Sequence, residues 1–442
     1  MADGGLFGEL PQQGNPKSAD QPRGAPRLRV PRRDQIELRA ADIESLIGED
    51  HRARLFWAYV MTLDVSELED EIEAREGASG RPKTMPQLLL ALWLYATSEG
   101  IGSARALDEL CKNHDAYRWL CGGVSVNYHT LSDFRVGCAE LLDRLLIEHL
   151  AALAYSGLIN LDVLAQDGMR LRANAGASSF RRAETLDRHL QTAQAVVEEL
   201  KREVEARSDS SNQRIKAAKV RAAREREERV KNAQASAAEI KRKREELEKR
   251  GGNGQKPKEP RASTTDPQAR VMKMADGGFR PGYNVQVVSA AGEQIVVSID
   301  VGNNGSDGGQ MRPMLERLQA LHGHLPKRHI VDGGFSSAED VEWAHGQGVE
   351  VYCPPKQGKK GTDPYAPRPR DGVGVAAWRA RMGSDDGKAQ YQIRTICECI
   401  HARWRNWDLR QVTVRGIAKV RAVVLLYALT NNVLQGRLLG SA

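Results

Sequence analysis

Hydrophobic residues recur at helical spacing through the first third of the chain. The pattern runs from Ile36 to Ser156. Within it, the segment PQLLLALWLYA begins with Pro86, which the first turn of a helix tolerates, and the apolar pattern stops at Gly100. These positions predict a compact bundle of helices.

A strand pattern begins after this bundle. The run LINLDVLAQDGMRLRANA, residues 158–175, predicts a buried strand, a turn at a glycine and a partner strand. Asp162 and Asp167 compete as its functional carboxylate, and because they are five residues apart they point to opposite faces. Asp167 is favoured, since the last residue of a central strand opens into the cleft where ligands gather. The alternative is a turn-forming aspartate.

Three later segments complete a predicted sheet. Tyr283–Ser289 and Gln294–Val301 alternate and are rich in valine and isoleucine, which predicts a hairpin. His329–Val331 predicts a short buried strand that ends at Asp332 and precedes a helix. Three other carboxylates of this part are interpreted as caps or turn residues: Asp266, Asp300 and Asp307.

Residues 183–250 have the pattern of a coiled coil. Apolar residues from Leu186 to Val204 alternate steps of four and three, and a weaker seam follows the polar stretch 208–212. This predicts an antiparallel helical hairpin. Because Glu is interleaved with Lys and Arg almost one for one, a solvated surface is favoured over a DNA clamp. Dimerisation through the hairpin is a further alternative.

The segment from Tyr391 to Arg405 predicts one helix with two contrasting faces. At about 100° per residue, Tyr391, Arg394, Glu398 and Arg405 share a face, and apolar residues that include Trp404 lie opposite. A carboxylate flanked by two guanidiniums would then face away from the core. The simpler alternative is an ordinary amphipathic helix with a solvated side.

The surrounding segments are less specific. Residues 356–390 are polar and rich in Gly and Pro, and a loop of this length is usually either functional or disordered. Because it contains several Lys and Arg, contact with a DNA backbone is the functional interpretation. Lys419 to Leu434 predicts a long apolar helix packed against the sheet.

Composition narrows the class of protein. The 442 residues allow two or three domains, and a net charge of +7 weakly favours a polyanionic partner. The six cysteines follow no zinc-site spacing, which favours free thiols in a reducing cytoplasm. We expect no apolar run to span a bilayer, and the start MADGGLFGELPQQG lacks a signal-peptide pattern, so we expect a soluble, unsecreted protein.

The spacing of Tyr391, Arg394, Glu398 and Arg405 resembles the signature of bacterial insertion-sequence transposases with an Asp-Asp-Glu (DDE) triad. The departure is Arg405, where lysine is usual, which keeps the charge but widens the group. The order PQLLLALWLYA, GIGSARALDELC, HTLSDFR looks like the helical domain that precedes the catalytic core in that family and is associated with binding the element's ends. Within HTLSDFR, caps and surface groups are an equally good reading of the polar residues.

The resemblance also covers the aspartates. Asp167-Gly168 looks like the family's first aspartate, and the run Asp-Gly-Gly-Phe at Asp332 looks like its second. It implies catalytic and metal-binding roles for Asp167, Asp332 and Glu398, with two Mg²⁺ ions or alternatively Mn²⁺, and DNA-phosphate contacts by Tyr391, Arg394 and Arg405. Base stacking by an aromatic residue is a further implication, for which the candidates are Trp343, Trp407 and, less readily because of its apolar face, Trp404.

The fold class implied is mixed α/β: a ribonuclease-H-like core, an all-α amino-terminal domain and an inserted helical coiled-coil hairpin, an order that the hydrophobic pattern also supports. The expected organisation is a disordered basic arm (1–33), a helical DNA-end-binding domain (34–156), a catalytic domain in two pieces (157–182 and 264–442), the coiled-coil insertion (183–250) and a flexible linker (251–263).

The activity implied is cut-and-paste transposition. The expected partners are double-stranded DNA, both terminal inverted repeats and target, and further copies of the chain in a homodimer or larger synaptic assembly, without a membrane. The expected location is the bacterial cytoplasm, on the nucleoid. Two alternatives stay open: a structure-specific nuclease on the same core without strand transfer, and a non-enzymatic DNA-binding coiled-coil protein.

Overall fold

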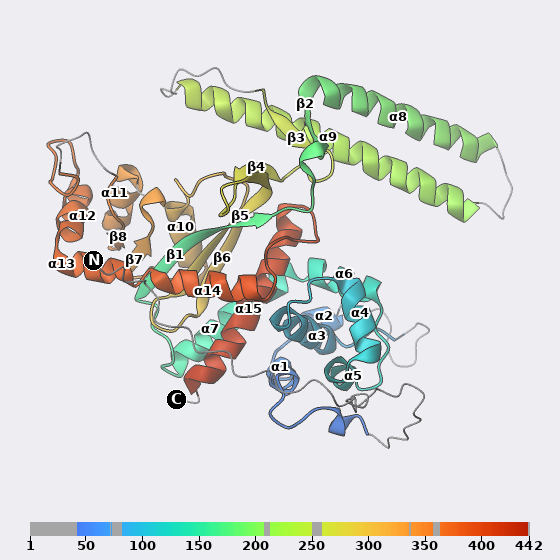
Figure 1. Ribbon diagram of the computed structural model, residues 1–442, viewed down its shortest axis with the longest axis horizontal. Coiled ribbons are helices and arrows are strands. Elements are labelled where there is room, and N and C mark those ends of the chain that lie inside the picture. Colours follow the sequence, from blue (N-terminus) through green and yellow to red (C-terminus); the bar gives the residue numbers. More distant parts are fainter. Residues whose placement is uncertain are drawn as a thin grey trace, which may run out of the picture. The chain divides into compact units, whose positions relative to one another are not determined.

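The computed structural model describes residues 42–70, 72, 82–206, 213–249, 259–335, 337–356 and 363–440. From Ile43 onward these residues belong to one compact unit (Figure 1). The expected basic arm, 1–33, lies outside the described residues, as do residues 251–258 of the expected linker.

Helices make up the first part of the described chain, as the spacing of apolar residues predicted. They are the 3₁₀ turn η1 (Glu44–Leu46) and the helices α1 (Arg52–Val60), α2 (Ser66–Asp70), α3 (Pro86–Ser98), α4 (Ala104–Asn113), α5 (Asp115–Cys121), α6 (Tyr128–Gly137) and α7 (Ala139–Tyr155). Helix α3 starts at Pro86, and nearly all of its side chains are buried. Such all-round burial makes α3 the central helix of this part.

The sheet is mixed. Its strands are β1 (Val163–Arg172), β4 (Arg270–Lys273), β5 (Phe279–Ala290), β6 (Val296–Gly302), β7 (Arg328–Val331) and β8 (Glu350–Tyr352). The order is β4-β5-β1-β7-β8, and β6 pairs with β5 on the same side as β4. Strands β1, β7 and β8 are parallel, whereas β5 is antiparallel to β1, β4 and β6. The predicted hairpin is thus found as β5 and β6.

The predicted turn at Gly168 is wrong. Strand β1 continues through it to Arg172, and Gly168 pairs with Gln286 of β5. The reason for glycine is close approach and not a turn, because a Cβ at this position would overlap the carboxylate of Asp307.

The remaining helices pack around the sheet. They are α10 (Met311–His322), α11 (Ala338–Gly346), α12 (Val373–Gly383), α13 (Asp385–Gln392), α14 (Thr395–Asn406) and α15 (Ile417–Gly440), with the short 3₁₀ turns η2 (Ala177–Ser179) and η4 (Gly333–Phe335). Helix α14 contacts β1 and β5, and α15 contacts β6, α3 and α7. Asn432 of α15 accepts a hydrogen bond from the Val296 N–H at 2.8 Å and donates one to its carbonyl oxygen at 2.7 Å, so α15 satisfies backbone groups of β6.

Helix α15 corrects one expectation. By length and composition it is apolar enough to cross a membrane, although no such segment was expected. However, 72% of its most apolar window is buried inside the protein. Burial of this extent is that of a core helix.

The chain segments just before and just after residues 183–250 pair with each other as a small two-stranded sheet. Strand β2 (Phe180–Arg182) pairs with β3 (Arg261–Ser263), so the last residues of the expected linker form a strand. Between them, α8 (Ala183–Ala206) and α9 (Gln213–Lys249) lie side by side (Figure 1). A small cluster of buried side chains joins the two helices to β3: Leu186, Ala233, Ala237 and Ala262.

The polar stretch 356–390, expected as a loop, contains α12 and most of α13; residues 357–362 lie outside the described part. Helix α12 is anchored by contacts that are distant in sequence. Glu342 accepts hydrogen bonds from the N–H groups of Gly374 and Val375, and the Trp378 indole donates to the Cys353 carbonyl oxygen at 2.9 Å. Because Glu342 of α11 supplies this cap, the sequence next to the start of α12 does not reveal it.

Candidate active site

The register of two strands brings Asp167 and Asp332 together. Strand β7 pairs with β1 in parallel only as far as Val331, which lies opposite Gln166. The next residue on each strand is one of the two aspartates. Asp167 therefore lies in the middle of its strand, not at its end as expected, but it lies where β7 stops and the edge of the sheet opens.

Asp332 is exposed and held by its neighbours. Its Oδ1 accepts a hydrogen bond from the N–H of Gly333 at 2.8 Å and another from the Tyr391 hydroxyl at 3.3 Å. Strand β7 thus positions the carboxylate of Asp332, and Tyr391 at the end of α13 orients it.

The predicted single helix from Tyr391 to Arg405 is interrupted. Helix α13 ends at Gln392 and α14 begins at Thr395. Between them the backbone stays right-handed but tightens: the Arg394 N–H donates to the Tyr391 carbonyl oxygen and the Cys397 N–H to that of Arg394, each three residues back. This tighter turn sets the direction of Arg394.

Arg394 joins two of the three predicted carboxylates. Its Nη2 lies 2.9 Å from Glu398 Oε1, and its Nη1 lies 3.5 Å from Asp167 Oδ2. Because one rigid guanidinium contacts both, these carboxylate oxygens are separated by roughly 9 Å at most. The Tyr391 ring lies 5.9 Å from the same guanidinium. Tyr391, Arg394, Glu398 and both aspartates therefore share one site, whereas Arg405 is exposed further along α14.

The charge at this site is unbalanced. Burial raises the pKa of Asp167 to about 6, and the nearby Asp307 and Asp332 add to the rise, although the Gly168 N–H and Arg394 oppose it. A raised carboxylate pKa means that the ionised form lacks enough positive charge around it. A cation placed beside Asp167 would relieve this deficit.

Sequence reasoning missed His401. Its imidazole is buried on α14, with Nδ1 3.7 Å from Asp167 Oδ2. Burial lowers its pKa to about 4, and the charges of Arg405 and Arg394 contribute, so the ring is neutral at neutral pH. The available signal was a histidine three residues after Glu398, at the border between the polar and apolar sides of the helix.

A polar cluster on the other face of β1 was also missed. Arg170 pairs with Asp307 at 2.9 Å, and Asp307 also accepts hydrogen bonds from Asn284 and Gln286. Burial alone would raise the pKa of Asp307, but these donors lower it overall. Asp307, interpreted as a cap or turn residue, is in fact the centre of a satisfied network.

The other candidate residues lie elsewhere. Trp404 is fully buried against Tyr427, so it belongs to the core, and the Trp343 ring is stacked on Arg312. In the helical part, Arg135, the arginine of HTLSDFR, is buried with its guanidinium 4.6 Å from the Trp93 ring, and it acts in packing.

The donor chemistry fits a hard divalent cation. Asp167, Asp332 and Glu398 offer only carboxylate oxygens, which Mg²⁺ and Mn²⁺ prefer, and the raised pKa of Asp167 favours a cation there. Within the residues that the structure describes, no three acidic, imidazole or thiol groups are close enough together to hold an ion as they stand. Arg394 supplies the positive charge between Asp167 and Glu398 instead.

Two family models match this chain. A transposase DDE domain matches residues 253–433, and a transposase domain, DUF772, matches residues 41–136. The first match contains Asp332 and Glu398 but not Asp167, and the second covers η1 to α5 and most of α6. No curated protein and no solved structure matches the chain.

Proposed function

Since this chain is a DDE-type transposase, we propose that it binds the ends of an insertion sequence, cuts them and joins them to target DNA by cut-and-paste transposition. The observation that carries the proposal is the convergence of Asp167, Asp332 and Glu398 around Arg394 and Tyr391. The three acids come from a strand, a strand end and a helix that are far apart in sequence.

We propose that Asp167, Asp332 and Glu398 are the catalytic carboxylates of a ribonuclease-H-like core. The mixed sheet, with α14 packed on β1 and β5, supports this fold. The same three side chains would hold two divalent cations, Mg²⁺ or alternatively Mn²⁺. When bound, such ions activate a water or a 3′ hydroxyl and stabilise the leaving oxygen of an in-line phosphodiester substitution.

The remaining residues of the site bind and orient. Tyr391 and Arg394 stand beside the carboxylates, so they would hold the phosphate that is cut, and Arg405 would hold a flanking phosphate. His401, neutral and buried behind Asp167, fills the space on the core side and excludes water there. Each proposed task falls to a side chain positioned by β1, by the end of β7, by α13 and the turn after it, or by α14.

The other parts of the chain would serve DNA recognition and assembly. We propose that the helical domain reads the terminal inverted repeats, and that two or more copies assemble on paired ends. The packed helices α8 and α9 would form the coiled-coil insertion of the core, with residues 157–182 and 264–442 as its catalytic pieces. A cytoplasmic, nucleoid-associated location follows from DNA as substrate.

The proposal is tested with Asp332→Asn in the full-length protein. Cleavage of duplexes that carry the ends of the encoding element should fall by at least about a thousandfold, because a ligand of the reacting centre is lost. Asp162→Asn is the matched control: Asp162 pairs with Lys327 at 2.8 Å, away from the site, and its loss should change the rate less than about threefold. Undiminished cleavage by Asp332→Asn would contradict the assignment.

A second assay separates the transposase from a nuclease on the same core. Pre-cut element ends are incubated with target plasmid and Mg²⁺, and joined products are counted. Joining that Asp332→Asn abolishes supports strand transfer, whereas cutting without joining would favour the structure-specific nuclease.

A further inference from the structure

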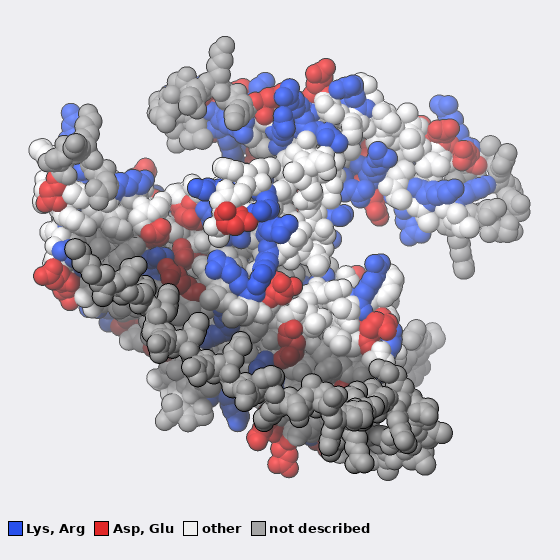
Figure 2. Space-filling view, in the orientation of Figure 1, with Lys and Arg blue, Asp and Glu red and all other residues white. Residues whose placement is uncertain are grey.

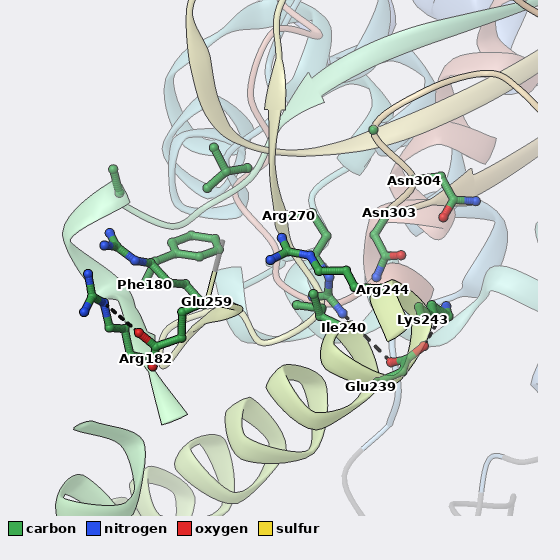
Figure 3. Close-up of a pocket in the computed structure, with 14 residues that line it drawn as sticks. Phe180, Arg182, Glu239, Ile240, Lys243, Arg244, Glu259, Arg270, Asn303 and Asn304 are labelled. Carbon is green, nitrogen blue, oxygen red and sulfur yellow. Dashed lines mark ion pairs between the residues drawn. The ribbon is translucent and has the colours of Figure 1, made fainter. Parts of the chain in front are cut away.

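An open groove of about 920 Å³ lies between α9, the β2–β3 pair, the edge strand β4 and the loop after β6. Figure 3 shows its walls: Phe180, Arg182 and Glu259 at one end, and Arg270, Arg244 and Asn303 with the face of α9 at the other. It is separate from the candidate active site, and none of the residues named so far as catalytic lines it.

The groove carries an excess of positive charge. Five cationic side chains line it, Arg182, Lys243, Arg244, Arg261 and Arg270, against two carboxylates. Each carboxylate already has a cationic partner. Glu259 pairs with Arg182 at 3.1 Å, and Glu239 pairs with Lys243 at 2.7 Å and lies 3.9 Å from Arg270. Three positive charges are therefore in excess over the acids, which attracts an anion.

The charges are spread along the groove and do not converge on one point. Arg182 and Arg244 stand at opposite ends in Figure 3, with amide side chains at Asn303 and Asn304. A second groove of about 690 Å³ lies further along the same side of α9, sharing Glu239 with the first, and is lined by Arg229, Arg415 and Lys419 together with Asp266. Figure 2 shows Lys and Arg gathered over this part of the surface, with some acids among them. A small anion needs a focused site, whereas an extended polyanion matches cations distributed along a surface.

The groove is connected to the catalytic strand. Asn303, Asn304 and Gly305 line it, and the same loop reaches Asp307 two residues later. Asp307 pairs with Arg170 of β1 and packs against Gly168, beside Asp167. The loop after β6 therefore forms one wall of the groove and, through Asp307, also contacts the strand that carries Asp167.

We propose that this groove binds the sugar–phosphate backbone of duplex DNA next to the segment that is cut. The inference rests on the proposed function and assigns a further DNA-binding surface to the carboxyl-terminal part of α9. Lys243, which would exchange Glu239 for a phosphate, and Arg244 are the main contacts, and Asn303 and Asn304 add hydrogen bonds to phosphate or sugar oxygens. The solvated-surface interpretation of α9 then holds for its other faces and not for this one.

The test compares two double variants of the same helix. Lys243→Gln with Arg244→Gln removes two charges from the groove, and Lys241→Gln with Arg242→Gln removes two charges from residues that do not line it. Glutamine keeps the helical propensity in both. Binding of a labelled 40-bp duplex by the full-length protein is measured by anisotropy over a range of salt concentrations.

The groove variant should bind roughly tenfold more weakly near 0.1 M salt, and the slope of log K against log salt should fall by about two, one for each lost phosphate contact. The control variant should stay within about twofold. Equal affinity and slope for the two variants would overturn the proposal. So would a groove variant that loses self-association in sedimentation while it binds DNA normally, because the groove would then hold another copy of the chain.

The result is independent of the catalytic assignment. Asp332→Asn should bind the duplex like the unmodified protein, so the binding comparison does not depend on cleavage. If Asp332→Asn still cuts, the active-site proposal fails while the binding comparison stands; if the groove variant binds normally, only the groove assignment fails.

Discussion

Two carboxylates on opposite sides of strand β1 show how one strand serves both chemistry and stability. Asp167 faces α14 with too little positive charge around it, and its pKa is raised to about 6. Asp307, from the loop after β6, packs against the next residue, Gly168, where Arg170 and two amides lower its pKa. The first carboxylate is left poised for a cation; the second is fully partnered. We interpret an unsatisfied acid as functional and a satisfied one as structural, which is the difference that mutations can test.

The largest expected difference is in catalysis. Asp167→Asn should reduce cleavage of element-end DNA by at least about a thousandfold, while the free energy of unfolding stays equal or rises, because a poorly compensated buried charge is removed. Cleavage is measured under single-turnover conditions and stability by urea unfolding. A variant that is inactive because it is unfolded would not support the comparison.

Asp307→Asn should act in the opposite way. The free energy of unfolding should fall by roughly 3 kcal/mol, because Arg170, whose side chain is only 15% exposed, loses its charged partner. The Asp307→Asn protein that remains folded at low temperature should still cut DNA. If Asp307→Asn instead abolishes cleavage at unchanged stability, Asp307 belongs to the catalytic machinery and the comparison is wrong.

Gly168→Ala tests the contact between the two sides. The added Cβ would overlap the Asp307 carboxylate and lie against Gln286, so we expect a loss of about 2 kcal/mol from overpacking. Gly292→Ala is a suitable control, because a Cβ there meets open space. Equal melting temperatures for the two variants would show that Asp307 does not need the glycine.

The two carboxylates also predict opposite responses to pH in metal-free buffer. The folded-state pKa of Asp167 is raised from 3.8 to about 6, so folding is favoured while it is protonated, and stability should fall by on the order of 2 kcal/mol as pH rises from about 4 to 6. Asp307 has a lowered pKa, so its contribution is present above its ordinary value and lost as pH falls below it. Asp167→Asn should remove only the first slope. An unchanged slope in that variant would show that another group titrates.

The positions of most candidate site residues in the fold could be predicted from the sequence, because their signals are local. A short apolar run before Asp332 and a buried strand around Asp167 placed both on the sheet, and helical periodicity put Arg394 and Glu398 on one side. What the sequence did not reveal depends on distant partners. The Arg170–Asp307 pair joins residues 137 positions apart, and the cap of α12 comes from Glu342, more than thirty residues earlier.

Two errors have a common physical cause. Gly168 was interpreted as a turn because glycine is usual there, yet tertiary packing uses it inside a strand. The segment 391–405 was interpreted as one helix because periodicity does not detect a tighter turn at Ile393 and Arg394. In each case the departure from the regular pattern lies beside a candidate catalytic side chain.

If Asp167, Asp332 and Glu398 serve one reacting centre, the three carboxylates must act as one unit. Metal-dependent cleavage of element-end DNA is measured for Asp167→Asn, Asp332→Asn, Glu398→Gln and the combination of the first two. We predict that each single variant falls to background and that the combination is no worse, since residues serving one reacting centre are not additive. Any single variant that cuts at the unmodified rate would contradict the site.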